Sequence, residues 1–188
     1  MSAELLVACL ALLIGVGVPL VAGHVRGRSY GLFTAAVLVL SLPGAVALHA
    51  RLAGDSPGLA PWLSFVSLYG IAASGLHLLS LVHARLRSAA FRWTLSVPGM
   101  TNLALGALAW PCLLLLWPLR AAAQAMDLPR TASLLAGLEW TPVVVAGASL
   151  LTSLRLRREH VHLDLDGRGH PSLARLAVRR RRRLPPAP

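Results

Sequence analysis

Residues 5–23 read LLVACLALLIGVGVPLVAG, nineteen consecutive residues without a charge. About 20 apolar residues, rising ~1.5 Å each, cross the ~30 Å hydrocarbon core of a bilayer. Glu4 precedes this run and Arg26 and Arg28 follow it, whereas a cleaved signal peptide carries positive charge before its apolar core. We therefore expect a retained transmembrane helix with its N-terminus outside the cell.

Comparable apolar runs fill most of the chain as far as residue 154. The 188 residues are 56% hydrophobic and 13% charged, whereas a soluble domain has about a quarter charged residues. The sequence predicts an all-α integral membrane protein, with a five-helix transmembrane bundle in residues 1–154. We expect its helices at about 5–23, 30–50, 61–82, 94–118 and 131–154.

The positions of the arginines predict the orientation. All 18 basic residues are Arg, a bias that indicates a bacterial genome rich in G and C. With the N-terminus outside, only Arg51, Arg120 and Arg130 face outward and the other fifteen are cytoplasmic. Because cytoplasmic loops are enriched in Lys and Arg, we expect a multi-pass protein of the plasma membrane with a cytoplasmic C-terminus.

Residues 155–188 differ in composition and predict a short, Arg-rich, mostly disordered cytoplasmic tail. Its five consecutive arginines are candidates for contact with anionic lipid headgroups, which attract juxtamembrane basic segments: Arg179, Arg180, Arg181, Arg182 and Arg183. Nucleic acid is a disfavoured partner, because no aromatic residues alternate with the arginines and no binding motif is present.

The tail also contains the alternating stretch HVHLDLDG at 160–167. On a strand, His160, His162, Asp164 and Asp166 would share one face, and such side chains suit a transition metal. We favour the alternative, a solvated face of a short amphipathic strand, because the two histidines are only two residues apart and only His170 could complete the set. No metal site, cofactor or known family is predicted from the sequence.

Glu139 is the most informative polar residue, because it lies inside the fifth apolar run. A carboxylate in hydrocarbon costs a few kcal/mol and usually faces the interior of the bundle. One interpretation is a protonatable group in a polar pathway. The favoured alternative is that the helix begins near Leu138, which leaves Glu139 beside Trp140 at the outer interface.

Three other polar residues share the apolar segments. His49 lies at the outer end of its segment and, with Asp55 and Glu139, is expected to approach the same outer region. His77 and Asn102 lie at similar depths in neighbouring segments, so we expect a hydrogen bond between them. No catalytic residues are predicted.

Three functions are compatible with this pattern. We favour a non-enzymatic membrane module that packs with itself or with a partner membrane protein, because intramembrane polar groups are few. The second is a small transporter or permease subunit that uses Glu139 and His49. The third is a membrane enzyme that acts on a lipid-linked substrate through His49, Asp55 and Glu139.

Overall fold

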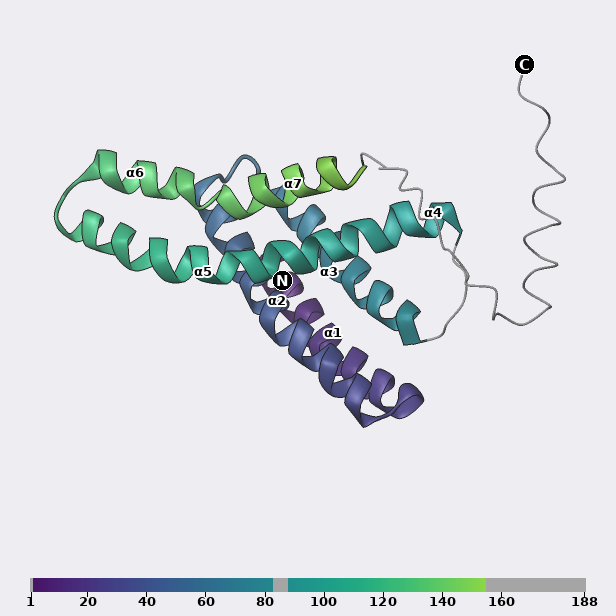
Figure 1. Ribbon diagram of the computed structural model, residues 1–188. Helices are drawn as coiled ribbons and strands as arrows, with labels where there is room; N and C mark the ends of the chain where they lie inside the picture. The colour runs from purple at the N-terminus through teal and green to yellow at the C-terminus, as the bar shows by residue number, and fades with distance from the viewer. Residues whose placement is uncertain (1, 83–87, 155–188) are drawn as a thin grey trace, which may run out of the picture. The chain divides into compact units, whose positions relative to one another are not determined.

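The computed structural model describes residues 2–82 and 88–154, and every regular element among them is a helix (Figure 1). These residues belong to one compact unit, Met1–Leu154. Its elements are α1 (Ala3–Arg26), α2 (Arg28–Asp55), α3 (Ala60–Val82), α4 (Ala89–Phe91), the π-helical turn η1 (Arg92–Ser96), α5 (Val97–Ala125), α6 (Pro129–Leu138) and α7 (Thr141–Leu154).

The unit contains five helical stretches long and apolar enough to cross a membrane, as predicted. The fourth is longer than expected. It runs without interruption through α4, η1 and α5 for 37 residues, Ala89–Ala125, instead of the predicted 94–118. The residues after 118, predicted as an outer loop, therefore continue the helix. The turn into α6 is confined to 126–128, where Asp127 adopts a φ of 53°, a left-handed conformation that Asp tolerates better than most residues.

The fifth stretch is broken, whereas the sequence predicted a continuous helix over 131–154. α6 ends at Leu138 and α7 begins at Thr141, so Glu139 and Trp140 form a turn between them. Pro142 follows immediately and has no N–H to continue a helical ladder from the preceding residues. α6 and α7 run back along α5 (Figure 1).

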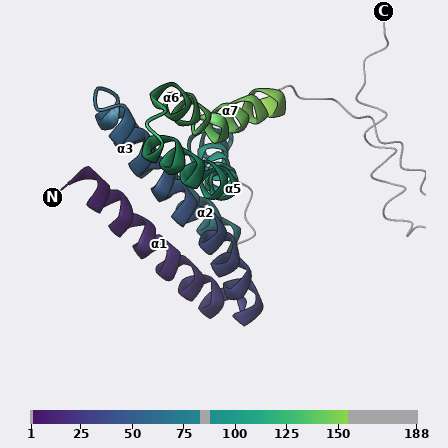
Figure 2. The same ribbon diagram turned by 90° about the vertical axis from the view of Figure 1, so that its left-hand side faces the viewer.

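The first two helices are joined by a single residue, Gly27, where a loop over 24–29 was predicted. Its φ of 102° is a conformation that favours glycine. Its N–H donates to the carbonyl of Gly23 and closes the end of α1. Figure 2 shows α1 and α2 as an antiparallel pair that leads away from this turn.

Close backbone contacts hold α5 against α2 and α3. A Cβ placed on Gly106 of α5 would lie 2.0 Å from the carbonyl oxygen of Ser41, and one on Gly44 of α2 would lie 2.2 Å from that of Gly106. A Cβ on Gly99 would lie 2.6 Å from the carbonyl oxygen of Ala73 in α3. Small residues permit this close approach of the helix backbones, which gives van der Waals contact between them.

Side chains pack in two apolar clusters. The first joins α1, α2 and α3 around Val7, Leu38 and Ile71, all at most 1% exposed. The second joins α2 and α5 around Leu48 and Ala109, with Trp140 and Val143 packed against it. Outward-facing surfaces are also apolar: Leu12, Leu40 and Leu114 are each at least 63% exposed. A surface of this kind suits contact with lipid rather than with water.

Candidate functional site

Glu139 occupies the turn between α6 and α7, and its side chain is fully buried. Its backbone N–H lies at the end of α6 and donates to the carbonyls of Leu135 and Ala136. The interruption of the helix therefore turns a carboxylate inward, toward α2 and α5. The sequence offered two positions for this residue, within a polar pathway or at an interface. The structure places it inside the unit, at a helix break.

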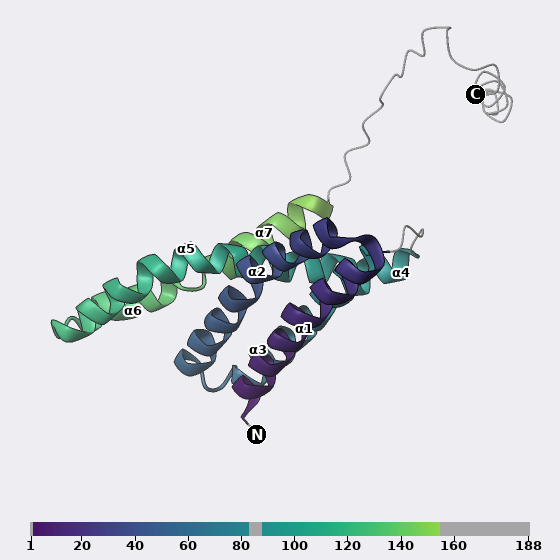
Figure 3. The same ribbon diagram turned by 90° about the horizontal axis from the view of Figure 1, so that it is seen from below.

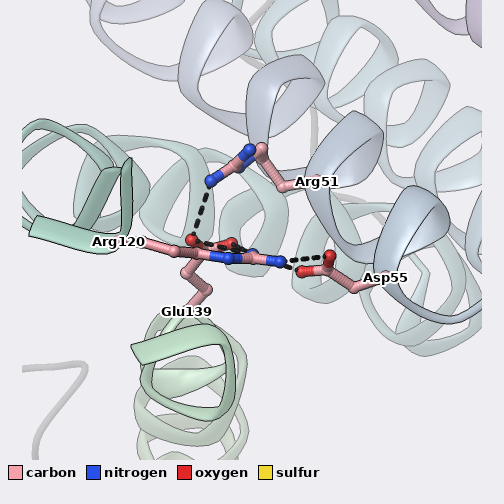
Figure 4. A network of polar contacts seen from close by, with 4 residues as sticks. All are labelled: Arg51, Asp55, Arg120 and Glu139. Atoms are coloured by element: carbon pink, nitrogen blue, oxygen red, sulfur yellow. Dashed lines mark hydrogen bonds and ion pairs between the residues drawn. The ribbon is translucent and has the colours of Figure 1, made fainter. Parts of the chain in front are cut away.

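Two arginines from two other helices contact this carboxylate (Figure 4). Arg51 of α2 donates from Nη2 to Oε1 at 3.1 Å. Arg120 of α5 donates from Nη1 to both carboxylate oxygens at 3.3 Å. A buried carboxylate needs this compensation, because taking a charge out of water without a partner is expensive.

Asp55 completes the cluster from the last turn of α2. It accepts two hydrogen bonds of 2.6 Å from Arg120, one from Nη1 and one from Nη2. This parallel pair is the strong fork geometry that a planar guanidinium makes with a carboxylate. Arg120 thus joins Asp55 to Glu139, and Figure 4 shows its side chain between the two acids.

We call Arg51, Asp55, Arg120 and Glu139 the ion cluster. Two guanidinium groups and two carboxylates have no net charge when all four are ionised. The cluster links α2, α5 and the α6–α7 turn, which are far apart in sequence. Arg51 and Asp55 are four residues apart on α2, a spacing that puts both on one face of the helix.

Sequence reasoning placed Asp55 and Glu139 in the same outer region, and the structure brings both to Arg120. It missed the two arginines, which were treated only as markers of the outer face. A signal was available, because Arg51 and Arg120 are two of the three arginines assigned to the same face as the two acids. A buried acid there calls for a cationic partner.

His49 forms a separate contact, with Ser67 of α3, at 3.3 Å from Nδ1 to Oγ. Its side chain is 4% exposed, and Nε2 is buried without a hydrogen-bond partner among the described residues. His49 is therefore not a member of the ion cluster, although it lies only two residues before Arg51.

The predicted hydrogen bond between His77 and Asn102 is wrong. Asn102 donates from Nδ2 to Oγ of Ser74 at 3.1 Å, and Ser74 donates onward to the carbonyls of Gly70 and Gly99. His77 and Asn102 were predicted at similar depths in their helices. However, Ser74 and Gly70, and not His77, lie on the face of α3 that contacts Asn102. Nδ1 of His77 is buried without a partner in the described part of the chain.

The remaining candidates, including His160, Asp166 and the run Arg179 to Arg183, lie outside the described residues. Within 2–82 and 88–154, no three His, Cys, Asp or Glu side chains are grouped closely enough to share a metal ion. The two described cysteines, Cys9 and Cys112, are not paired in a disulfide. Among the described residues, the charged side chains that come together are therefore those of the ion cluster.

In comparisons with known proteins, no protein-family model, curated protein or solved structure matches the chain.

Proposed function

We propose that this chain is a multi-pass membrane protein with a structural rather than a catalytic role, in which the ion cluster clamps the α6–α7 segment to α2 and α5. The observation that carries the proposal is the fully buried Glu139, which accepts hydrogen bonds from two arginines on two other helices. A carboxylate held in this way is already compensated, so its most direct role is to fix the packing of three segments.

Placement in a plasma membrane is part of the proposal. It is supported by the five apolar helices and by the leucines that they expose. The distribution of arginines supports an N-terminus outside and a C-terminus in the cytoplasm. In that orientation the ion cluster lies toward the outer face, where a charge-neutral arrangement lowers the cost of placing four ionic groups near hydrocarbon.

The partner in the proposal is a second copy or another membrane subunit. The α6–α7 stretch supports this part of the proposal. Of the residues in its most apolar segment, only 17% are buried, compared with 44% in the corresponding segment of α2. Val144 and Leu151 of α7 are 66% and 67% exposed. Either lipid or a helix of a partner can cover such a surface, and small residues such as Gly147 permit close approach.

A small transporter is the second candidate, and the helix break favours it. Transporters place broken helices and ionisable groups together at their binding sites, and Glu139 lies at such a break. A membrane enzyme has less support, because Asp55 and Glu139 accept hydrogen bonds from guanidinium groups that would compete with their action as general bases.

One substitution distinguishes a structural role of the ion cluster, as a clamp, from a role in transport. Glu139→Gln keeps the shape of the side chain but removes the charge that Arg51 and Arg120 require. For a clamp, we expect lower stability in mild detergent and loss of any oligomer that native gels or mass photometry detect for the unmodified protein. For a transporter, we expect a folded, stable protein that has lost a proton-driven flux in proteoliposomes.

The matched control is Asp127→Asn, which removes an acid from the exposed turn between α5 and α6. It should change neither stability nor assembly. If Glu139→Gln is as stable as the control, the clamp is wrong. If the unmodified protein is strictly monomeric in lipid nanodiscs and co-purifies with no other protein, the partner half of the proposal is wrong.

A further inference from the structure

A groove of about 540 Å³ lies between α1 and α2, on the side of the Gly27 turn. Ten residues from the two helices line it, among them Gly15, Gly23, His24, Arg28, Gly31 and Ala35. Eight of them are apolar or lack a side chain, and the remaining two, His24 and Arg28, are basic or can become so. The two polar residues are the ones nearest the turn in sequence. Figure 3 shows α1 and α2 running toward this turn.

Glycines shape the groove. A Cβ placed on Gly31 would lie 2.8 Å from Cα of Gly23, so the two backbones touch beside the turn. Gly15 has no side chain to fill the space next to Leu42, the nearest contact of its hypothetical Cβ at 3.6 Å. The lining of the groove is therefore backbone at its glycines and apolar side chain elsewhere, a surface that suits an acyl chain.

The three side chains with nitrogen donors near the turn are not equivalent. Arg26 is engaged, because it donates to the carbonyl of Leu81 at 2.6 Å and lies over the ring of Tyr30 at 4.7 Å. Arg28 and His24 are exposed at the groove, and neither is paired with an acid among residues 2–82 and 88–154. Two donors thus face the same opening with no internal acceptor described for their side chains.

The length of the groove fits one membrane leaflet. Gly15 and His24 are nine residues apart on α1, which corresponds to a rise of about 14 Å. Half of a ~30 Å hydrocarbon core is about 15 Å. An acyl chain that runs from the level of Arg28 toward Gly15 would therefore reach the middle of the bilayer.

We propose that this groove binds one anionic phospholipid, with the headgroup phosphate on Arg28 and His24 and one acyl chain along the apolar floor. The N–H groups of both side chains donate to phosphate oxygens. The apolar residues that line the groove shield the acyl chain from water. The site uses none of the tail arginines and does not depend on the role of the ion cluster. In the proposed orientation it opens to the cytoplasmic leaflet, where anionic lipids attract basic residues.

The test is native mass spectrometry of the full chain, released from micelles that contain equal amounts of phosphatidylglycerol and phosphatidylcholine with the same acyl chains. We expect one phosphatidylglycerol molecule to be retained in preference. Arg28→Gln should weaken its retention about five-fold, the change expected from one basic residue near anionic lipid. Arg28→Lys should retain it, because the positive charge remains.

Ala35→Phe tests the groove itself, because the added ring occupies the acyl channel without changing a charge. Its preference for phosphatidylglycerol should then fall at least as far as it does in Arg28→Gln. Arg130→Gln is the control, since it removes an equivalent charge from α6, away from the groove. Equal retention of the two lipids by the unmodified protein overturns the proposal. So does an Ala35→Phe protein that prefers phosphatidylglycerol as strongly as the unmodified protein, which would assign the lipid to the tail.

Discussion

The two connections between α2 and α5 differ in kind. At Gly44 and Gly106 the helices meet backbone to backbone, and a single added methyl group would overlap a carbonyl oxygen. At Arg51 and Arg120 they meet through long side chains that share a buried acid. The first contact depends on shape and the second on charge. We therefore expect the close contact to be sensitive to added side-chain volume, and the ion cluster to be sensitive to the loss of a charge that more than one partner shares.

The largest expected effect is that of Arg120→Gln. This change leaves both Asp55 and Glu139 without their shared guanidinium. Breaking a buried ion pair from one side typically costs ~3–5 kcal/mol, so we expect the free energy of unfolding in mild detergent to fall by that order. Chemical unfolding followed by circular dichroism measures it. A loss below ~1 kcal/mol would mean that the cluster contributes little, as surface pairs do.

Gly106→Ala is the corresponding change at the close contact. The new methyl group would overlap the carbonyl of Ser41, so α2 and α5 must separate, at a cost of ~1–3 kcal/mol for overpacking. Gly17→Ala on α1 is the matched control, because its Cβ meets nothing within 4 Å. The control should be neutral or stabilise by up to ~1 kcal/mol through helix propensity. Equal effects at the two positions would contradict the steric account.

Asn102→Ala tests a third kind of contact between helices, a hydrogen bond with no net charge. We expect a loss of about 1 kcal/mol, typical of polar contacts between transmembrane helices. A double-mutant cycle with Ser74→Ala should show coupling, because the two side chains are bonded. A cycle with His77→Phe should be additive. Strong coupling to His77 would restore the pairing that the sequence suggested.

The smallest effect within the ion cluster is expected for Arg51→Gln. Arg51 makes one bond to Glu139 and its side chain is 34% exposed, whereas that of Arg120 is 13% exposed. Glu139 keeps Arg120 in this variant, so we expect a loss of about 1 kcal/mol or less. The same unfolding assay compares the two arginines directly. A loss equal to that of Arg120→Gln would assign the clamp to Arg51 instead.

The helices were predictable because the length of an apolar run and its composition are enough to identify a stretch that can cross a membrane. The break at Glu139 was not predicted as a break. Pro142 was a signal for one, but the alternative considered only moved the start of the helix to Leu138 and did not include a separate α6 before it. The ends of the fourth stretch were also missed. The prediction ended the helix at Pro118, but α5 continues through this residue to Ala125.

The ion cluster was half predictable. The two acids were assigned to one outer region from their depth in the sequence, but their partners require the register between α2 and α5. That register is set by Gly44 and Gly106, whose close contact cannot be recognised in a chain rich in glycine. The pairing of Asn102 failed for the same reason, since depth along a helix does not give the direction in which a side chain points.

The uninterrupted helix from Ala89 to Ala125 also has a consequence for the way in which the protein meets its surroundings. Thirty-seven residues rise roughly 55 Å, and even at a tilt of about 40°, the upper end of the usual range, they extend over roughly 40 Å. In a bilayer, at least two helical turns must therefore project beyond the hydrocarbon. Any part that projects at the α6 end is supported by α6, which runs back along it. An antibody bound at the exposed turn over 126–128 would therefore be held in a fixed orientation and make this small protein visible to cryo-electron microscopy.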